Sequence, residues 1–211
     1  MSDVKEFDTR PAGNVEAESP LAWSLHRQKA LPQDAQAGVT LQEQAFLGHL
    51  VLRGGAITLD EAVREVLGIA LPAKPNTVTQ DASGERSIQW MSPDEWLVIV
   101  PSGEEINLES QLRKAMGQAH CSIVNVSGGQ TVLTLEGEKA RDVLMKSTPY
   151  DVHPQAFPVG KGVTTVFAKS SIVLRRPTEH RWELVVRRSF ADYCYRWLLD
   201  AAAEHGIDIN R

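Results

Sequence analysis

Short apolar runs and amphipathic stretches alternate through the first part of the chain. Residues 46–53 form an apolar run that ends at a glycine pair, which favours a buried strand. Residues 58–68 repeat apolar side chains at helical spacing, and Thr58 with Glu61 predicts a capping box at the helix start. The elements predicted after this helix are strands over 86–91 and 96–100, a helix over 105–116 and a strand over 121–126.

The same alternation begins again after a glycine turn at residues 127–129. Its two glycines lie between two predicted strands, which favours a tight hairpin over a phosphate-binding loop. A last helix is predicted to begin at a cap formed by Ser189 and Asp192 and to stop before Gly206. The other elements predicted here are a strand over 131–135, a helix over 138–146 and strands over 163–167, 172–175 and 182–186.

The order strand, helix, strand, strand, helix, strand is that of a split ferredoxin-like unit. We therefore predict an α+β protein with two ferredoxin-like split β-α-β halves and mainly antiparallel sheets. The first half is expected over residues 21–127 and the second over 128–211, together forming one compact unit. The last helix is expected to bury one face, and the residues predicted on it are Phe190, Tyr193, Cys194, Trp197, Leu198 and Ala201.

Residues 1–20 differ from the rest because they mix acidic residues, proline, glycine and serine with few large apolar side chains. Such a segment buries too little apolar surface to offset the entropy lost on ordering. We expect an N-terminal arm that is extended or disordered until it orders against a partner.

Charge and composition exclude several classes of function. The 211 residues carry a net charge of -5, which gives no overall attraction to nucleic acid. No apolar stretch reaches about 18 residues and the acidic N-terminus does not resemble a signal peptide, so no membrane association is expected. The two cysteines lack metal-binding or disulfide-framework spacing, which favours reduced thiols and a cytoplasmic location.

The residue types that carry chemistry are present but scattered. Histidines fall on separate predicted elements, so no metal site is predicted, and no nucleophile elbow occurs. Cys194 lies at helical spacing from Leu198 and is expected to be a small buried hydrophobe. We predict no catalytic, cofactor-binding or metal-binding residue in this chain.

Two pairs of large or charged residues are candidates for contacts with a partner. Trp90 and Trp96 flank the turn at residues 92–94, where they either fill the core or anchor a protein interface. Arg187 and Arg188 lie near a strand end, as do the arginines at 175–176. Solvated strand ends are favoured for both arginine pairs, and a grip on a carboxylate or phosphate is the alternative.

Four stretches together resemble one family. They are LGIALPAKPN, IQWMSPDEWLVIVPS, LEGEKARDVLMKSTPYDVHPQAFPVG and VVRRSFADYCYRWLLDAA. Their order and spacing are similar to those of the gamma subunits of heterotetrameric sarcosine oxidases, and the likeness covers the chain from about residue 19 onward.

This resemblance implies a subunit of an oxidoreductase that demethylates sarcosine to glycine, producing hydrogen peroxide and 5,10-methylenetetrahydrofolate or formaldehyde. It implies FAD, FMN, NAD, tetrahydrofolate and zinc in other subunits, and alpha, beta and delta partners, chiefly alpha. It also implies a fold similar to the folate-binding domain of aminomethyltransferases. That family carries an asparagine-bearing turn and a catalytic aspartate where this chain reads VPSGEEIN, so the folate chemistry is expected to be lost.

The interpretation that follows is a non-catalytic assembly subunit that packs on the folate-binding part of the alpha subunit. Trp90, Trp96, Arg187 and Arg188 are its expected interface residues. Two alternatives stay open, namely an independent tetrahydrofolate-binding protein of the aminomethyltransferase type and a ferredoxin-like regulatory module.

Overall fold

The computed structural model describes residues 17–27 and 37–210 of the chain, and its strands form two sheets. The expected arm over residues 1–20 lies mostly outside the described residues. The first sheet has five strands in the order β3-β4-β5-β2-β6. These strands are β2 (Gly48–Gly54), β3 (Val78–Gln80), β4 (Ser87–Ser92), β5 (Glu95–Val100) and β6 (Cys121–Asn125). All four of its strand pairings are antiparallel.

The second sheet has six strands in the order β11-β1-β7-β10-β9-β8. Its members are β1 (Val39–Gln44), β7 (Gln130–Glu136), β8 (Gly162–Phe167), β9 (Ser170–Arg175), β10 (Arg181–Arg187) and β11 (Ile207–Asn210). Only the pairing of β1 with β11 is parallel among those in this sheet of the described chain. The α+β class with mainly antiparallel sheets is thereby confirmed.

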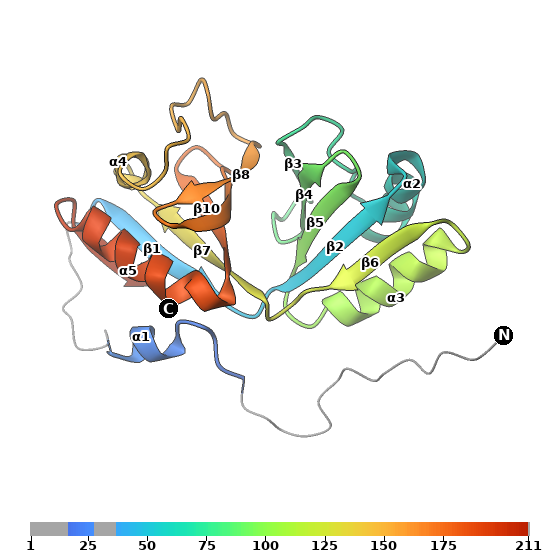
Figure 1. The fold of residues 1–211 in the computed structure, drawn as a ribbon, viewed down its shortest axis with the longest axis horizontal. Coiled ribbons are helices and arrows are strands. Elements are labelled where there is room, and N and C mark those ends of the chain that lie inside the picture. The colour runs from blue at the N-terminus through green and yellow to red at the C-terminus, as the bar shows by residue number, and fades with distance from the viewer. Residues whose placement is uncertain (1–16, 28–36, 211) are drawn as a thin grey trace.

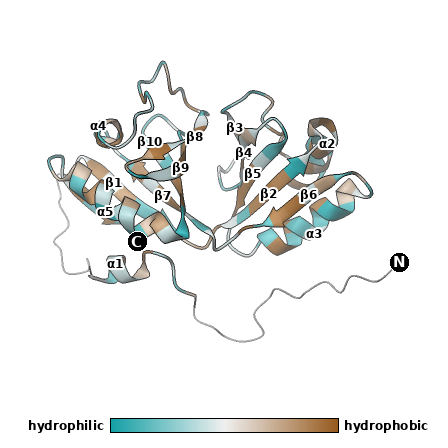
Figure 2. Cartoon of the chain, viewed as in Figure 1, coloured by the Kyte–Doolittle hydropathy of each residue, from teal (hydrophilic) through white to brown (hydrophobic). Residues whose placement is uncertain are grey.

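Helices cover the outer face of each sheet, as Figure 1 shows. The helices α2 (Ala56–Leu67) and α3 (Glu105–Met116) pack on the five-stranded sheet, where their apolar residues join one buried cluster. The helices α4 (Ala140–Met145), α5 (Ala191–Ala202) and the short α1 (Ala22–Arg27) contribute to a second cluster on the six-stranded sheet. In Figure 2, both the helices and the strands carry hydrophobic and hydrophilic segments.

The two sheets meet through a smaller apolar cluster and a set of polar contacts. Leu97 and Ile99 of β5 pack with Val132, Val173 and Val185 of the six-stranded sheet. Backbone hydrogen bonds join residues 76–78 to residues 160–162, with lengths of 2.9 and 3.0 Å. The two ferredoxin-like halves are therefore fastened to each other face to face, with helices outside.

The N-terminal part of the expected first half belongs to the other sheet. β1 pairs with β7 and β11, and Leu21 lies in the core of the six-stranded sheet. Residues 21–27 and 39–44 therefore pack with the second half. The sequence pattern gave no signal for α1, β1, β3 or β11, because each is at most seven residues long and their apolar positions find partners only across the fold.

Three local predictions are corrected. The helix α2 begins at Ala56, so its N-cap is Gly55, three residues before the predicted cap Thr58; no side chain forms a cap hydrogen bond there, and the capping box is absent. Ser189 lies in a 3-10 turn before α5, whose N-cap Phe190 likewise has no side-chain cap bond. The glycines at 127–129 connect strands of different sheets, so they form a crossing between the sheets and no hairpin.

Candidate interaction surface

Two buried titratable groups in the described part of the chain have strongly shifted pKa values. Burial raises the pKa of the Cys194 thiol to about 11, consistent with its expected place in the core. Burial likewise lowers the pKa of His49 to about 4. Within residues 17–27 and 37–210, no three His, Cys, Asp or Glu residues lie together as a metal site would require. No described helix is long and apolar enough to span a bilayer.

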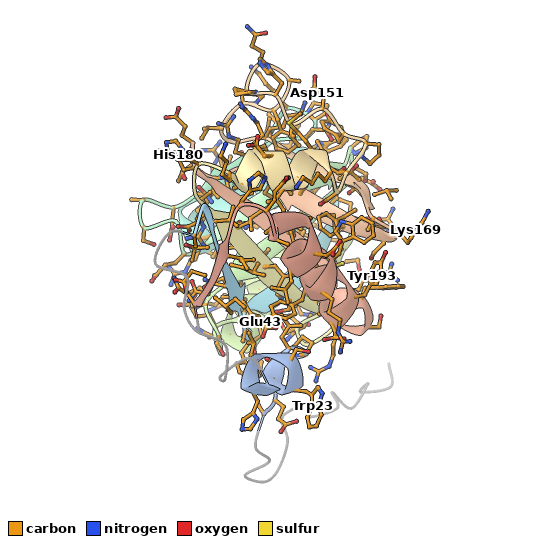
Figure 3. All side chains as sticks on the ribbon, turned by 90° about the vertical axis from the view of Figure 1, so that its left-hand side faces the viewer. Trp23, Glu43, Asp151, Lys169, His180 and Tyr193 are labelled. Atoms are coloured by element: carbon orange, nitrogen blue, oxygen red, sulfur yellow. The ribbon has the colours of Figure 1, made fainter. Side chains whose placement is uncertain are left out.

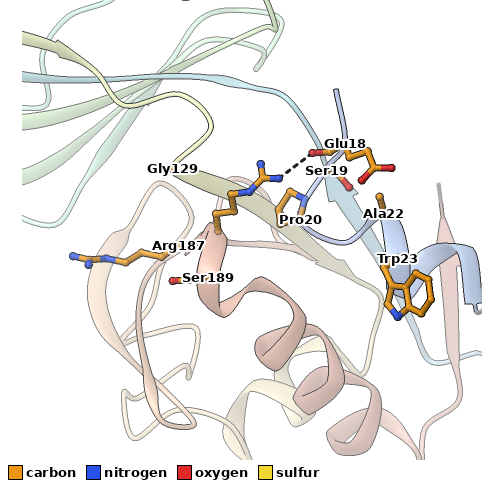
Figure 4. Close-up of a pocket in the computed structure, with 9 residues that line it drawn as sticks. Glu18, Ser19, Pro20, Ala22, Trp23, Gly129, Arg187 and Ser189 are labelled. Atoms are coloured by element: carbon orange, nitrogen blue, oxygen red, sulfur yellow. Dashed lines mark hydrogen bonds between the residues drawn. The ribbon is translucent and has the colours of Figure 1, made fainter. Parts of the chain in front are cut away.

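A groove of about 650 Å³ lies between α1 and the start of α5. Arg188 holds its two sides together, since its backbone N–H donates to the Gly129 carbonyl at 2.9 Å and its Nη2 donates to the Glu18 carbonyl at 3.2 Å. Figure 4 shows Arg187 pointing away from Glu18. The residues lining the groove are Glu18, Ser19, Pro20, Ala22, Trp23, Gly129, Arg187, Arg188 and Ser189.

Aromatic side chains are exposed on the two helices that border this groove, and the Trp197 indole N–H donates to the Ser147 hydroxyl at 3.2 Å. Phe190, Tyr193 and Trp197 recur at helical spacing at the start of α5 and are 43%, 37% and 37% exposed. The rings of Tyr193 and Trp197 lie 6.3 Å apart, and Trp23 on α1 is 69% exposed. A hydrogen bond from Ser24 to Asp192 fastens α1 to α5, and Figure 3 shows both helices on one side of the molecule.

We call this region the α1–α5 surface, defined by Trp23, Phe190, Tyr193 and Trp197 with Arg187 and Arg188. Each of these six residues is classed as exposed, and no ion pair joins the arginines to a described carboxylate. Exposed aromatic rings and arginines are the residue types that are enriched in protein interfaces.

The aromatic part of this surface corrects the sequence prediction, which placed Phe190, Tyr193 and Trp197 in the core. The buried stripe of α5 is instead formed by Ala191, Cys194, Tyr195, Leu198, Ala201 and Ala202. The apolar residues of this helix cover more than one stripe, and such a pattern indicates a second contact surface. That width is the signal in the sequence that could have identified the surface.

The two tryptophans proposed for the interface lie in the other half of the fold. Trp90 and Trp96 are directly opposite each other on β4 and β5. Trp96 is only 2% exposed and belongs to the core beneath α2 and α3, and Trp90 packs partly buried against the same cluster. The structure therefore does not bring the tryptophans together with Arg187 and Arg188.

The arginines at 175 and 176 correct a second expectation, because they are buried rather than solvated at a strand end. Arg175 is 4% and Arg176 is 7% exposed. Arg175 pairs with Glu183, and Arg176 donates to the backbone carbonyls of Phe157 and Glu179. Arg187 and Arg188 are exposed as expected.

The sequence of this chain matches a known protein family. Residues 53–204 match the model of the sarcosine oxidase, gamma subunit family. The chain belongs to this family. A sarcosine oxidase subunit gamma from Corynebacterium sp. (strain U-96) is 35% identical over 187 residues, which cover 88% of this chain and 90% of that relative. One from an Arthrobacter species is 34% identical over 181 residues, covering 85% and 88%.

Solved structures extend the likeness from sequence to fold. A chain of the heterotetrameric sarcosine oxidase from Corynebacterium sp. U-96, in complex with pyrrole 2-carboxylate, matches with a TM-score of 0.80 and 34% identity, over 90% of this chain and 96% of that one. Glycine cleavage system aminomethyltransferase T from Bartonella henselae matches with a TM-score of 0.66 and 13% identity, over 90% and 58%. The second likeness shows a shared fold alone and confirms the expected aminomethyltransferase-like architecture.

Proposed function

We propose that this chain is a non-catalytic assembly subunit of a heterotetrameric sarcosine oxidase and that it binds a partner subunit through the α1–α5 surface. Family membership and the match to a chain of a heterotetrameric enzyme support a place in such a complex. The observation that carries the interface is the row of exposed aromatic residues on α5 beside two exposed arginines.

Exposed aromatic rings are the physical reason for choosing this surface. Contiguous apolar area in water is unfavourable, so large patches usually mark contact sites. Tyr, Trp and Arg are also the residue types that dominate binding free energy when a partner covers them. Arg187 and Arg188 add positive charge at the edge of the patch, which favours a partner surface that carries carboxylates.

The complex that we propose contains alpha, beta and delta subunits, of which alpha is the chief partner through its folate-binding part. In it, FAD, FMN, NAD, tetrahydrofolate and zinc belong to the other subunits. The whole enzyme oxidises sarcosine to glycine, reduces O2 to hydrogen peroxide, and transfers the one-carbon unit to tetrahydrofolate or releases it by hydrolysis as formaldehyde. Two free cysteines fit the reducing cytoplasm that we propose as its location.

Co-expression of this chain with the other subunits tests the interface. Tyr193→Ala removes an exposed ring without opening the core, and it is expected to reduce the amount of alpha subunit that co-purifies with the tagged chain. Ile57→Ala is the matched control, because Ile57 is 80% exposed on α2 of the other half and its loss should change nothing. Unaltered assembly of the Tyr193→Ala variant, together with an unchanged melting temperature of the free chain, contradicts the proposed interface.

An independent tetrahydrofolate-binding protein is the second candidate, and the fold shared with aminomethyltransferase T is the observation in its favour. A ligand that binds only the folded state raises the melting temperature by mass action. A melting temperature that rises with tetrahydrofolate in the free chain supports this candidate. A melting temperature that tetrahydrofolate leaves unchanged supports the assembly role.

A further inference from the structure

A buried arginine that forms no ion pair with a described residue lies away from the α1–α5 surface. Arg176 directly follows β9, and its guanidinium lies over the indole ring of Trp182, with 5.2 Å between the guanidinium carbon and the ring centroid. Its Nη1 donates to the Phe157 carbonyl at 2.7 Å and its Nη2 to the Glu179 carbonyl at 3.0 Å. Carbonyl dipoles and an aromatic face therefore fix the side chain in one orientation.

The charge of Arg176 has no carboxylate partner among the described residues, although the side chain is 7% exposed. Its Nε is also buried without a hydrogen-bond acceptor in that part of the chain. The neighbouring Arg175 shows the usual arrangement, since it pairs with the buried Glu183. An unpaired buried cation is costly, and an anion that binds beside it recovers part of that cost.

A pocket of about 300 Å³ opens beside this guanidinium. Arg141 of α4 and His180 line it as well, and neither forms an ion pair with a described residue. The remaining lining residues are Gly137, Glu138, Pro154, Glu179 and Trp182. Arg176, which is held in one orientation, and Arg141 of α4 therefore border the same small space.

Glu138 and Glu179 decide which anion fits this pocket. Both line it, and neither side-chain carboxylate forms an ion pair with the Arg176 guanidinium. Their negative charges disfavour a doubly charged phosphate more than a singly charged group. A carboxylate also matches the planar fork of a guanidinium, which binds carboxylates through paired hydrogen bonds.

We infer that this pocket binds a carboxylate group, with Arg176 and Arg141 as its donors. The carboxylate belongs either to a free small monocarboxylate or to an Asp or Glu side chain of a partner subunit. The inference does not depend on the α1–α5 surface, because the pocket lies at the opposite end of β10, where residues 176–182 meet the start of α4.

Saturation-transfer NMR of the full chain with sodium propionate, at constant ionic strength, measures this binding directly. Arg141→Gln should weaken propionate binding about tenfold, the loss expected for one charge-assisted hydrogen bond. Lys114→Gln is the matched control, because it removes an exposed positive charge on α3 and should leave binding unchanged. Glu179→Gln should strengthen binding, because it removes a negative charge that lines the pocket.

The assembled complex separates the two sources of the carboxylate. Propionate that binds equally to the complex and to the free chain identifies a free ligand. Propionate that binds the free chain and is excluded from the complex identifies a partner side chain in the pocket. No binding to the wild-type chain, or equal binding to the Arg141→Gln variant, overturns the inference. The Tyr193→Ala variant keeps the pocket, so failure of the proposed interface does not alter the result.

Discussion

Arg175 Nε donates a 2.9 Å hydrogen bond to Glu183 Oε2, and the two residues lie directly opposite each other on β9 and β10. Arg175 Nη1 also donates to the Ser87 hydroxyl at 2.9 Å, across to β4 of the other sheet. Both members of the ion pair are less than 8% exposed. Glu183 also lies 3.3 Å from Arg181 Nε, so this buried ion pair belongs to a small charge network that joins the two halves of the fold.

Removing one member of this pair should destabilise the chain strongly. Glu183→Gln leaves the buried Arg175 without its counter-ion, and we expect a loss of about 3 kcal/mol in the free energy of unfolding. Replacing both residues, as in Arg175→Met with Glu183→Leu, should cost less than the single change because no charge stays buried alone. Urea unfolding measures both values. Asp94→Asn, at the exposed pair with Arg53, is the control and should unfold like the wild type.

His49 should make the stability depend on pH in the acidic range. Burial, and to a smaller extent the positive charge of Arg175, lowers its pKa from 6.5 to about 4, although its bond to the Leu47 carbonyl opposes the shift. Between pH 6.5 and about 4, the unfolded chain binds a proton at His49 and the folded chain does not. Stability should therefore fall as the pH decreases through this window.

The His49→Gln variant isolates that contribution. The difference in unfolding free energy between wild type and variant should shrink by on the order of 3 kcal/mol from pH 6.5 to pH 4 and stay constant above pH 7. Urea unfolding at five pH values provides the measurement. Parallel stability curves for the two proteins would show that His49 does not stay neutral in the folded chain.

Gly162 should tolerate no side chain. A Cβ at this position would lie 1.9 Å from Gln89 Oε1, and the same Gln89 side chain donates to the Gly162 carbonyl at 3.0 Å. Gly162→Ala must push this buried amide away from the joint between the sheets, at a cost of about 1–3 kcal/mol. Gly55→Ala meets open space and should change stability by less than about 1 kcal/mol. Thermal unfolding compares the two.

The two cysteines should react at very different rates with a thiol reagent. Cys194 is fully buried and its pKa is raised to about 11 by desolvation, so little thiolate forms at pH 8. Cys121 is partly exposed. The native free chain should incorporate one label and the denatured chain two, as counted by mass spectrometry. Native Cys121→Ser should incorporate none, and a label on Cys194 in that variant would contradict its burial.

The sequence by itself determined the elements whose apolar pattern is long and local. The helix over residues 105–116 and the strands over 96–100 and 182–186 needed no information from the rest of the chain, and their order indicated two ferredoxin-like units. Four stretches of sequence, taken together in their order and spacing, sufficed to indicate the family, which the comparisons confirm.

Only the tertiary structure decided which side chains face water and which strands share a sheet. The strand β1 joins the second half because it pairs with β7. The paired residues are more than 85 positions apart in the sequence, and no local pattern specifies such a partner. Similarly, Arg176 is buried although it was expected in solvent, and Trp197 is exposed although it was expected in the core. Burial depends on the neighbouring element rather than on residue type. Candidate binding surfaces depend on these long-range contacts, so they became visible only in the folded chain.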